Sequence, residues 1–296
     1  MDHLHYDFSA WPLRAREPVS GAAQLQAFVV LCLEHWEADP PEGSLRDPRF
    51  VGEFGSFSPD YRNWTQREYG LRIGVFRVMD ALKAQGICPA VAANAKAVQR
   101  LPQLVQAFND WGCEWIGHGQ TASSLQHSGM GLTEQREAIA QSLQTLRECT
   151  GRQPLGWLSQ DWGTTPETYA LLAEAGIAYT LDWTNDDQPY WLKTQPPVLA
   201  VPLSAEWDDV QCQWLRNLDP HQHAELTLQA FDRLRQEAQQ SQRSPVMGLA
   251  LHPWVCGMSS RIGALRQLLA DMRSRPDVHW SQPASIFKHF PRSPLP

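Results

Sequence analysis

Residues 154–183, PLGWLSQDWGTTPETYALLAEAGIAYTLDW, alternate two short apolar runs with a helical stretch. The runs at 154–159 and 177–183 have the length and composition of buried strands. Residues 166–175 between them are predicted to form a helix, and Gly176 follows it as the residue type that most readily ends one. A strand, a helix and a second strand in this order are typical of a parallel sheet with helices on its outer face.

The same alternation recurs along the chain and predicts an α/β fold, namely a distorted, TIM-like barrel of seven or eight strand–helix units. We expect an N-terminal arm over residues 1–24 and one barrel domain over residues 25–296. The expected strands are 27–33, 88–94, 113–118, 154–159, 177–183, 198–203 and 246–252. The expected helices are 71–85, 101–111, 133–149, 166–175, 222–240 and 260–274. Residues 35–70 and 184–197 are expected to be long loops of the kind that form lids or binding surfaces.

The composition of the chain argues against some classes of binding partner. The chain has 25 Lys and Arg against 32 Asp and Glu, a net charge of -7, which disfavours binding to nucleic acid or to an anionic membrane. It has no apolar run long enough to cross a membrane, and its first residues do not resemble a signal peptide, so we expect a cytoplasmic protein. Six scattered cysteines suggest neither a zinc knuckle nor a disulfide framework. The composition is compatible with a homo-oligomer.

Three side chains that are capable of acid–base catalysis follow expected strands that are far apart in sequence. Glu34 ends the apolar run AFVVLCL, His118 follows CEWIG, and His252 follows VMGLAL. In a parallel barrel these strand ends meet on one rim. A carboxylate beside an apolar strand has a raised pKa unless it is paired or binds a metal, so Glu34 is the candidate general base. The alternatives are a hydrogen-bonded structural carboxylate and structural histidines, but two histidines at equivalent strand ends favour function.

Other polar and aromatic residues are expected near the same rim. We expect Gln160 and the tryptophans Trp157 and Trp254 to contribute to a pocket for a small ligand, although core and lid packing would also account for the tryptophans. The run of Asn185, Asp186 and Asp187 is interpreted either as turn chemistry or as substrate binding, and the two are compatible.

Several segments together resemble a known family. They are YGLRIGVFRVMDALKAQGICPAVAANA, LPQLVQAFNDWGCEWIGHG, TGRQPLGWLSQDWGTTPETYALLAEAGIAYTLDW, NDDQPY and GLALHPWVCGMSSRIGAL. They resemble the polysaccharide-deacetylase (NodB-homology) superfamily and, within it, the allantoinase-like and cyclic-imide-hydrolase-like branch. The resemblance covers about residues 25 to 290 and implies a distorted barrel with carbohydrate-related or ureide-related hydrolase activity.

The resemblance also implies roles for individual residues. His118 matches the first histidine of the H-x-x-x-H metal motif, and His252 matches the histidine of the late L-H-P motif that acts as general acid. Arg152 and Trp157 fall in the R-x-P-x-x-W segment that lines one wall of the site. Asp182 falls in the segment that orients catalytic groups. These positions make Glu34, His118, His252 and Asp182 the expected catalytic residues.

Two departures from the family pattern concern the metal. The segment LCLEHWE offers Glu34 where the family has a pair of aspartates, and Ala122 stands where the second metal histidine is expected. A catalytic zinc needs about three protein ligands. We therefore favour hydrolysis without a metal, while Glu34, His118 and a third group such as His35 would be the ligands if a divalent ion, with Zn²⁺ as the first choice, were bound.

The preferred hypothesis is a hydrolase that cleaves the carbon–nitrogen bond of a small amide, cyclic ureide or imide. Glu34 would take a proton from water, His252 would protonate the leaving nitrogen, and His118 with backbone N–H groups would stabilise the oxyanion. One alternative is a metal-dependent deacetylase of an N-acetylated carbohydrate. Another is a noncatalytic barrel that binds a ligand.

Overall fold

One curled sheet forms the centre of the computed structural model, which describes residues 4–14, 24–40, 42, 44 and 59–291. Its strands are β1 (Leu25–Leu33), β2 (Ala90–Ala93), β3 (Glu114–Gly117), β4 (Gly156–Trp157), β5 (Tyr179–Thr180), β6 (Tyr190–Trp191), β7 (Leu199–Ala200), β8 (Val246–Leu251) and β9 (Val278–Trp280). The order is β6-β7-β5-β4-β3-β2-β1-β8, with β9 beside the start of β1. Every described pairing is parallel except that of β6 with β7. The prediction of a distorted, TIM-like α/β barrel is confirmed.

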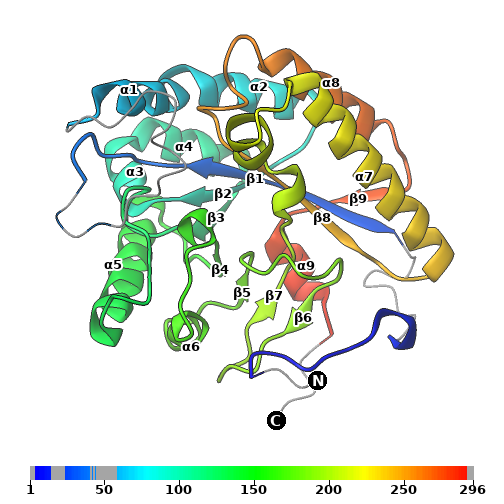
Figure 1. Ribbon diagram of the computed structural model, residues 1–296, viewed down its shortest axis with the longest axis horizontal. Coiled ribbons are helices and arrows are strands. Elements are labelled where there is room, and N and C mark those ends of the chain that lie inside the picture. The colour runs from blue at the N-terminus through cyan, green and yellow to red at the C-terminus, as the bar shows by residue number, and fades with distance from the viewer. Residues whose placement is uncertain (1–3, 15–23, 41, 43, 45–58, 292–296) are drawn as a thin grey trace.

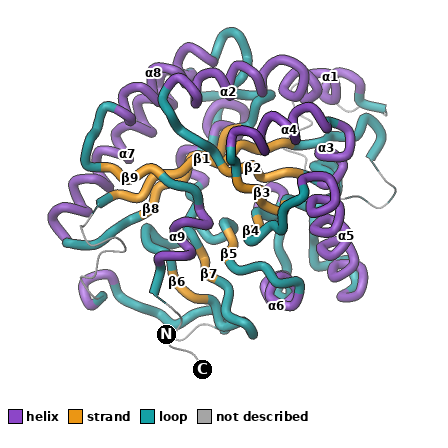
Figure 2. Tube along the Cα trace, turned by 180° about the vertical axis from the view of Figure 1, so that it is seen from behind, coloured by secondary structure: helices purple, strands orange, loops and turns teal. Residues whose placement is uncertain are grey.

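The helices lie on the outer side of this sheet (Figures 1 and 2), except the last one, whose Ile286 packs in the cluster of inner strand residues such as Val30. They are α1 (Tyr61–Tyr69), α2 (Val75–Ala84), α3 (Ala95–Arg100), α4 (Pro102–Trp111), α5 (Leu132–Thr150), α6 (Thr168–Glu174), α7 (Pro220–Ser241), α8 (Ile262–Arg273) and α9 (Pro283–His289). A π-helical turn, Gly70–Gly74, joins α1 to α2. No helix of the described residues is long and apolar enough to cross a membrane.

The position of strand β1 in the sheet explains why its sequence is an almost unbroken apolar run. All nine of its residues are buried. Alternate side chains, such as Leu31, pack in the cluster that includes residues of the surrounding helices, whereas Val30 and its even-numbered neighbours pack with residues of the other strands. Side chains of successive strand residues point to opposite faces, so a strand with two covered faces is apolar at nearly every position, and in β1 Gln26 is the exception.

The expected strands and helices are all present, most of them shorter than expected. The structure adds β6, β9, α1, α3 and α9. Helix α1 lies within residues 35–70, which were expected to be a loop, and that part of the prediction was wrong. Its sequence YRNWTQREY has few apolar residues and so carries little of the periodicity that indicates an amphipathic helix.

The described part of the N-terminal segment packs against the loop that follows β5. Arg14 forms an ion pair with Asp186 at 2.6 Å, and the backbone N–H of Lys193 donates to the carbonyl oxygen of His5 at 2.7 Å. A barrel domain starting near residue 25 remains a prediction. The six cysteines are all free thiols, and of these Cys149 is exposed.

Candidate functional site

Polar side chains from distant parts of the chain line one cavity of about 150 Å³ at the carboxyl ends of the parallel strands. Glu34 follows β1, His118 follows β3 and His252 follows β8. Gln160 and Trp254 line the same cavity. The structure therefore brings together the three residues that the strand ends singled out, because neighbouring parallel strands end on the same rim.

Glu34 is buried, with 5% of its surface exposed, and it accepts three side-chain hydrogen bonds. Gln160 Nε2 donates to Oε1 at 2.5 Å. The indole N–H groups of Trp36 and Trp254 donate to Oε2 at 3.2 and 3.1 Å. Burial raises the pKa of Glu34, but the positive charge of His252 and the hydrogen bond from Gln160 act against it, and the net pKa lies below the usual value. Glu34 is thus a carboxylate at neutral pH.

His118 presents a lone pair to this carboxylate. Its Nδ1 lies 2.6 Å from the carbonyl oxygen of Leu158, which can only accept a hydrogen bond, so Nδ1 carries a proton. In the neutral ring Nε2 is then an acceptor, and it lies 3.6 Å from Glu34 Oε1. No hydrogen-bond partner of Nε2 occurs among the described residues. A water molecule that lies beside these two acceptors can donate one hydrogen bond to each of them.

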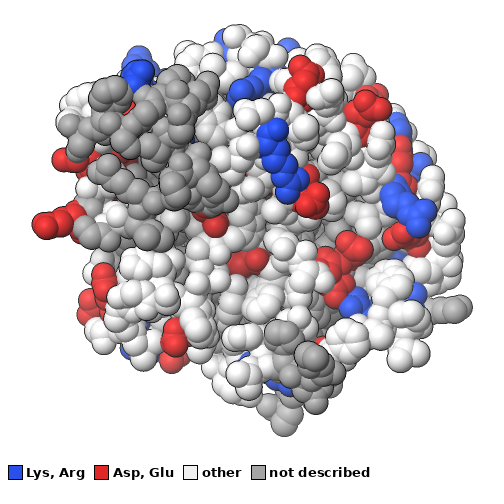
Figure 3. All heavy atoms as spheres, in the orientation of Figure 1, with Lys and Arg blue, Asp and Glu red and all other residues white. Residues whose placement is uncertain are grey.

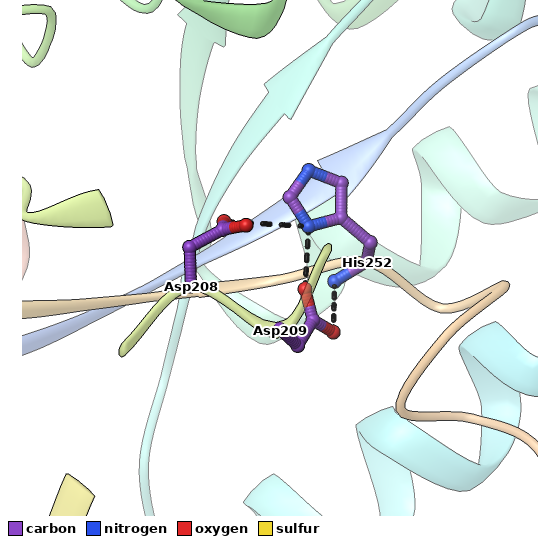
Figure 4. Close-up of side chains that lie close together, drawn as sticks. All are labelled: Asp208, Asp209 and His252. Atoms are coloured by element: carbon purple, nitrogen blue, oxygen red, sulfur yellow. Dashed lines mark hydrogen bonds and ion pairs between the residues drawn. The ribbon is translucent and has the colours of Figure 1, made fainter. Parts of the chain in front are cut away.

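His252 is fixed by two aspartates that follow β7 in the chain (Figure 4). Its Nδ1 lies 2.6 Å from Asp209 Oδ1, and its backbone N–H donates to Asp209 Oδ2 at 2.9 Å. Asp208 Oδ2 is 3.7 Å from the same Nδ1. On the other side of the ring, Nε2 lies 4.0 Å from Glu34 Oε1.

These neighbours decide the charge of His252. Burial lowers its pKa, but Cys32, Asp209 and Asp208 raise it by more, so the net pKa lies well above 6.5. Burial raises the pKa of Cys32 itself to about 11 and that of Asp208 to about 7, so at neutral pH most of the negative charge beside His252 comes from Asp209. His252 is therefore an imidazolium with a proton on Nε2, which can be given to a leaving group.

Asp208 and Asp209 were missed by the sequence analysis. The signal was present as two adjacent acids in AEWDDV, soon after the apolar run at 198–203. Both are buried, and burial raises the pKa of Asp208 to about 7. Buried carboxylates need a compensating partner, and His252 is that partner here.

The metal site of the family does not fit the residues at its positions. Ala122 lines the cavity and offers no ligand atom, and the oxygens of Glu34 already accept three N–H groups. Ligand atoms of Asp208, Asp209 and His252 do lie within 4.8 Å of one another, which is close enough to hold a metal ion. The hydrogen bonds between Asp209 and His252 account for the same arrangement without one.

His35, the suggested third ligand, does not line this cavity. Its Nδ1 contacts Arg100 Nη1, and its backbone N–H donates to Asn94 Oδ1 at 2.9 Å. Burial and the positive charge of Arg100 lower the pKa of His35 to about 4. The structure thus contradicts the prediction that His35 joins Glu34 and His118 in a metal site.

Asp182 and Trp157 lie behind the cavity rather than on its wall. Asp182 accepts hydrogen bonds from the backbone N–H and the hydroxyl of Ser159, at 2.6 and 2.9 Å. Trp157 is buried in the core and donates from Nε1 to the Ser159 hydroxyl at 3.0 Å. The predicted substrate contact of Trp157 is wrong, and Asp182 is placed to position Ser159, next to Gln160, rather than to touch a substrate. Burial raises the pKa of Asp182 to about 6 despite the bonds from Ser159.

Arg152 is at the opposite end of the sheet. Its guanidinium donates to the carbonyl oxygens of Cys113 and Asn109 at 3.3 and 3.2 Å. Because Arg152 precedes β4, it lies at the amino ends of the strands, whereas the cavity lies at their carboxyl ends. The prediction that Arg152 lines the site is wrong.

Asn185, Asp186 and Asp187 are also outside the cavity. Asn185 binds Tyr6, Asp186 pairs with Arg14, and the carbonyl oxygen of Asp187 accepts from the N–H of the first residue of β8 at 2.8 Å. The loop after β5 therefore returns to the amino ends of the strands. It was expected to stay at the carboxyl end, and for that reason the expectation that these three residues lie at the catalytic cavity is wrong.

Charged groups on the described part of the face shown in Figure 3 are interspersed, with Lys and Arg close to Asp and Glu. This distribution is in line with the overall charge of -7. It gives no support to a nucleic-acid partner on this face, since such a partner needs clustered positive charge.

Comparison with known proteins supports the family resemblance. No protein-family model matches the chain. The chain is 24% identical over 231 residues, 71% of its own length and 70% of the relative's, to a Schizosaccharomyces pombe protein named "Putative polysaccharide deacetylase".

Two solved structures share the fold at a TM-score of 0.75 each. One is the PuuE allantoinase, with 26% identity over 90% of both chains. The other is a "probable polysaccharide deacetylase" from Pseudomonas aeruginosa PAO1, with 25% identity over 90% of this chain and 91% of that chain. Both similarities extend over nearly the whole chain, as the sequence motifs do.

Proposed function

Because the resemblance of this chain to the polysaccharide-deacetylase superfamily and its allantoinase-like branch is confirmed, we propose that it hydrolyses a carbon–nitrogen bond of a small cyclic ureide or imide. The observation that carries the proposal is the meeting of Glu34, His118 and His252 around one cavity. The relatives are named as deacetylases and an allantoinase, so hydrolysis of a carbon–nitrogen bond is the chemistry that they have in common.

The geometry supports separate roles for the acid and the base. Water that donates hydrogen bonds to Glu34 Oε1 and His118 Nε2, which lie 3.6 Å apart, is held for attack on a substrate carbonyl. Glu34 takes the proton of this water as the new carbon–oxygen bond forms. The imidazolium of His252 then gives its Nε2 proton to the departing nitrogen as the carbon–nitrogen bond breaks. In this tautomer His118 orients water rather than donating to the oxyanion, which revises its expected role.

The size of the cavity favours a small substrate. Its volume of about 150 Å³ suits a single five-membered or six-membered ring better than a carbohydrate chain. A metal-dependent deacetylase is the second candidate, favoured by the names of two relatives and by the close approach of Asp208, Asp209 and His252.

Replacement of Glu34 by Gln tests the proposal. Glu34→Gln keeps the size of the side chain but removes the base, and we expect turnover of a cyclic ureide or imide to fall by at least about 10²-fold. Glu114→Gln is the matched control, because Glu114 is a partly buried carboxylate at the amino end of β3 that binds Tyr179 at 2.5 Å, far from the cavity. Its turnover should stay close to that of the wild type.

The outcomes of these experiments distinguish the proposed hydrolase from the alternatives. Near-wild-type turnover in Glu34→Gln would exclude Glu34 as the base. If the wild type binds ureides or imides in a thermal-shift screen but consumes none of them, the protein is a noncatalytic ligand-binding barrel. Turnover of N-acetylated sugars that depends on an added divalent metal would favour the deacetylase.

A further inference from the structure

Arg67 is a buried cation on the wall of the catalytic cavity that the sequence analysis did not single out. It belongs to α1, is 4% exposed and lines the same cavity as Glu34 and His252. We propose that Arg67 binds a second carbonyl oxygen of the substrate and so makes the enzyme selective for imides and ureides over amides with a single carbonyl. This inference rests on the proposed function and assigns a residue to its specificity.

Three indole rings hold the guanidinium in place. Its central carbon lies 4.5 Å from the ring centroid of Trp254, 4.7 Å from that of Trp36 and 5.7 Å from that of Trp214. Arg67 Nη1 also donates to the backbone oxygen of Asn63 at 3.3 Å. A cation held against aromatic faces loses little further freedom when it binds a ligand.

Arg67 keeps its charge in this position. Burial lowers its pKa to about 10, while Glu34 and Asp60 act to raise it. The group therefore remains a guanidinium at neutral pH. Its planar N–H donors suit an oxygen acceptor such as a carbonyl.

The same two indoles connect this cation to the base. Trp36 and Trp254 each pack against Arg67, and each donates its indole N–H to Glu34 Oε2. The position of Arg67 relative to Glu34 is thus fixed by side chains that contact both. When one carbonyl of a ring is attacked by the water at Glu34, a second carbonyl of the same ring can be held by Arg67.

The charge of the cavity wall favours a neutral acceptor over a carboxylate. Among the described lining residues, the acids outnumber the cations Arg67 and His252: they are Glu34, Glu37, Asp60, Asp161 and Asp208. An anionic substrate would be repelled by this field, whereas a neutral dicarbonyl ring would not. Succinimide and hydantoin are rings of this kind, and 2-pyrrolidinone is a ring of similar size with one carbonyl.

The test measures binding in an inactive background, so that it does not depend on turnover. The dissociation constants of succinimide, hydantoin and 2-pyrrolidinone are determined by calorimetry for Glu34→Gln alone and combined with Arg67→Met. We expect the second change to weaken binding of succinimide or hydantoin about 10- to 100-fold, as for a lost hydrogen bond to a charged group, and that of 2-pyrrolidinone less than about two-fold.

Arg77→Met in the same background is the matched control. Arg77 lies on α2, packs at 5.8 Å from the centroid of Tyr69 and donates to the Tyr69 hydroxyl at 2.6 Å, but it does not line the cavity. It should leave all three dissociation constants unchanged. Arg67→Lys is the second variant, since it keeps the charge without the planar donors, and it should weaken dicarbonyl binding by less than Arg67→Met.

The role of Arg67 would be overturned if its replacement weakened binding of one-carbonyl and two-carbonyl rings equally. It would also be overturned if the Arg67 variants unfolded cooperatively on heating and bound the two-carbonyl rings as tightly as the Glu34→Gln background does. Failure of Glu34→Gln itself to bind any of the rings, together with no turnover by the wild type, would instead overturn the proposed function, and this inference with it.

Discussion

Asp209 holds both the ring and the backbone of His252, through Oδ1 at 2.6 Å from Nδ1 and Oδ2 at 2.9 Å from the backbone nitrogen. One carboxylate therefore sets the orientation and much of the charge of the proposed general acid. The opposite ring nitrogen faces Glu34 across 4.0 Å. The two groups that exchange protons with substrate and water thus have opposite charges at neutral pH.

Replacement of Asp209 by Asn should move the alkaline limb of the pH profile. The acid is active when protonated, so activity is present below the pKa of His252 and is lost as the pH rises through it. Asp209 raises that pKa. In Asp209→Asn the pKa falls, and the loss of kcat/KM should begin at lower pH, with a decrease of about 10- to 100-fold at pH 8. The pH dependence of kcat/KM measures this directly.

Asp208→Asn is the control for Asp209→Asn. Asp208 carries the same type of side chain, is equally buried, and lies farther from Nδ1, at 3.7 Å. Its replacement should shift the alkaline limb in the same direction but by less. An alkaline limb that stays where it is in both variants would contradict the assignment of His252 as the acid.

The indole N–H groups of Trp254 and Trp157 should differ in their effect on catalysis. Trp254→Phe removes the N–H that donates to Glu34 Oε2, and we expect kcat to fall about 10-fold because the carboxylate loses a donor that helps to fix it. Trp157→Phe removes an N–H that donates to Ser159 and should cost stability while leaving kcat within about two-fold. Steady-state kinetics and thermal unfolding distinguish the two, and equal losses of kcat would count against the special position of Trp254.

Removal of metal should leave the activity unchanged. The residues at the family's metal positions provide Glu34 and His118 but, at Ala122, no third ligand, and a zinc site needs about three. After dialysis against a chelator, turnover should stay within about two-fold of the untreated enzyme. A stoichiometric metal in elemental analysis, with activity that is lost on its removal and restored by zinc, would refute this expectation and direct attention to Asp208, Asp209 and His252.

Substitution of Gly74 by Ala tests how tightly the turn that follows His252 is packed. A Cβ on Gly74 would lie 2.2 Å from the carbonyl oxygen of Pro253, so Gly74→Ala must displace the turn that follows His252. We expect it to lower the free energy of unfolding by about 1–3 kcal/mol and also to reduce kcat. Gly263→Ala is the control, since nothing lies within 4 Å of its added Cβ in α8, and it should change stability by at most about 1 kcal/mol, in the favourable direction. Denaturant unfolding compares the two variants, and equal stabilities would mean that the close approach of Pro253 to Gly74 does not constrain the turn.

The strands were predictable because their signals are local. The runs that became β1, β2, β3 and β8 are mostly apolar, and all of their residues except Glu114 are buried. Strands β6 and β9 carry no such pattern and were missed. Helix α1 was missed for the same reason, and Arg67 with it.

Most errors in the site came from loops, and Trp157 in β4 is the exception. Asn185, Asp186 and Asp187 follow β5, but their loop turns back and binds Tyr6, Arg14 and the start of β8. Arg152 was placed on a wall of the site by its motif, although it precedes its strand. The path of a loop depends on contacts with residues distant in sequence, which no local pattern encodes.

By itself, the sequence determined the parallel barrel and the meeting of Glu34, His118 and His252, because strand periodicity is local and parallel strands end on one rim. Only the tertiary structure decided that Asp209 charges His252, that Glu34 is ionised despite its burial, and that Arg67 joins the same wall. The physical reason is that charge and orientation in a buried site depend on which partners approach within a few ångströms, and packing of the whole chain determines that.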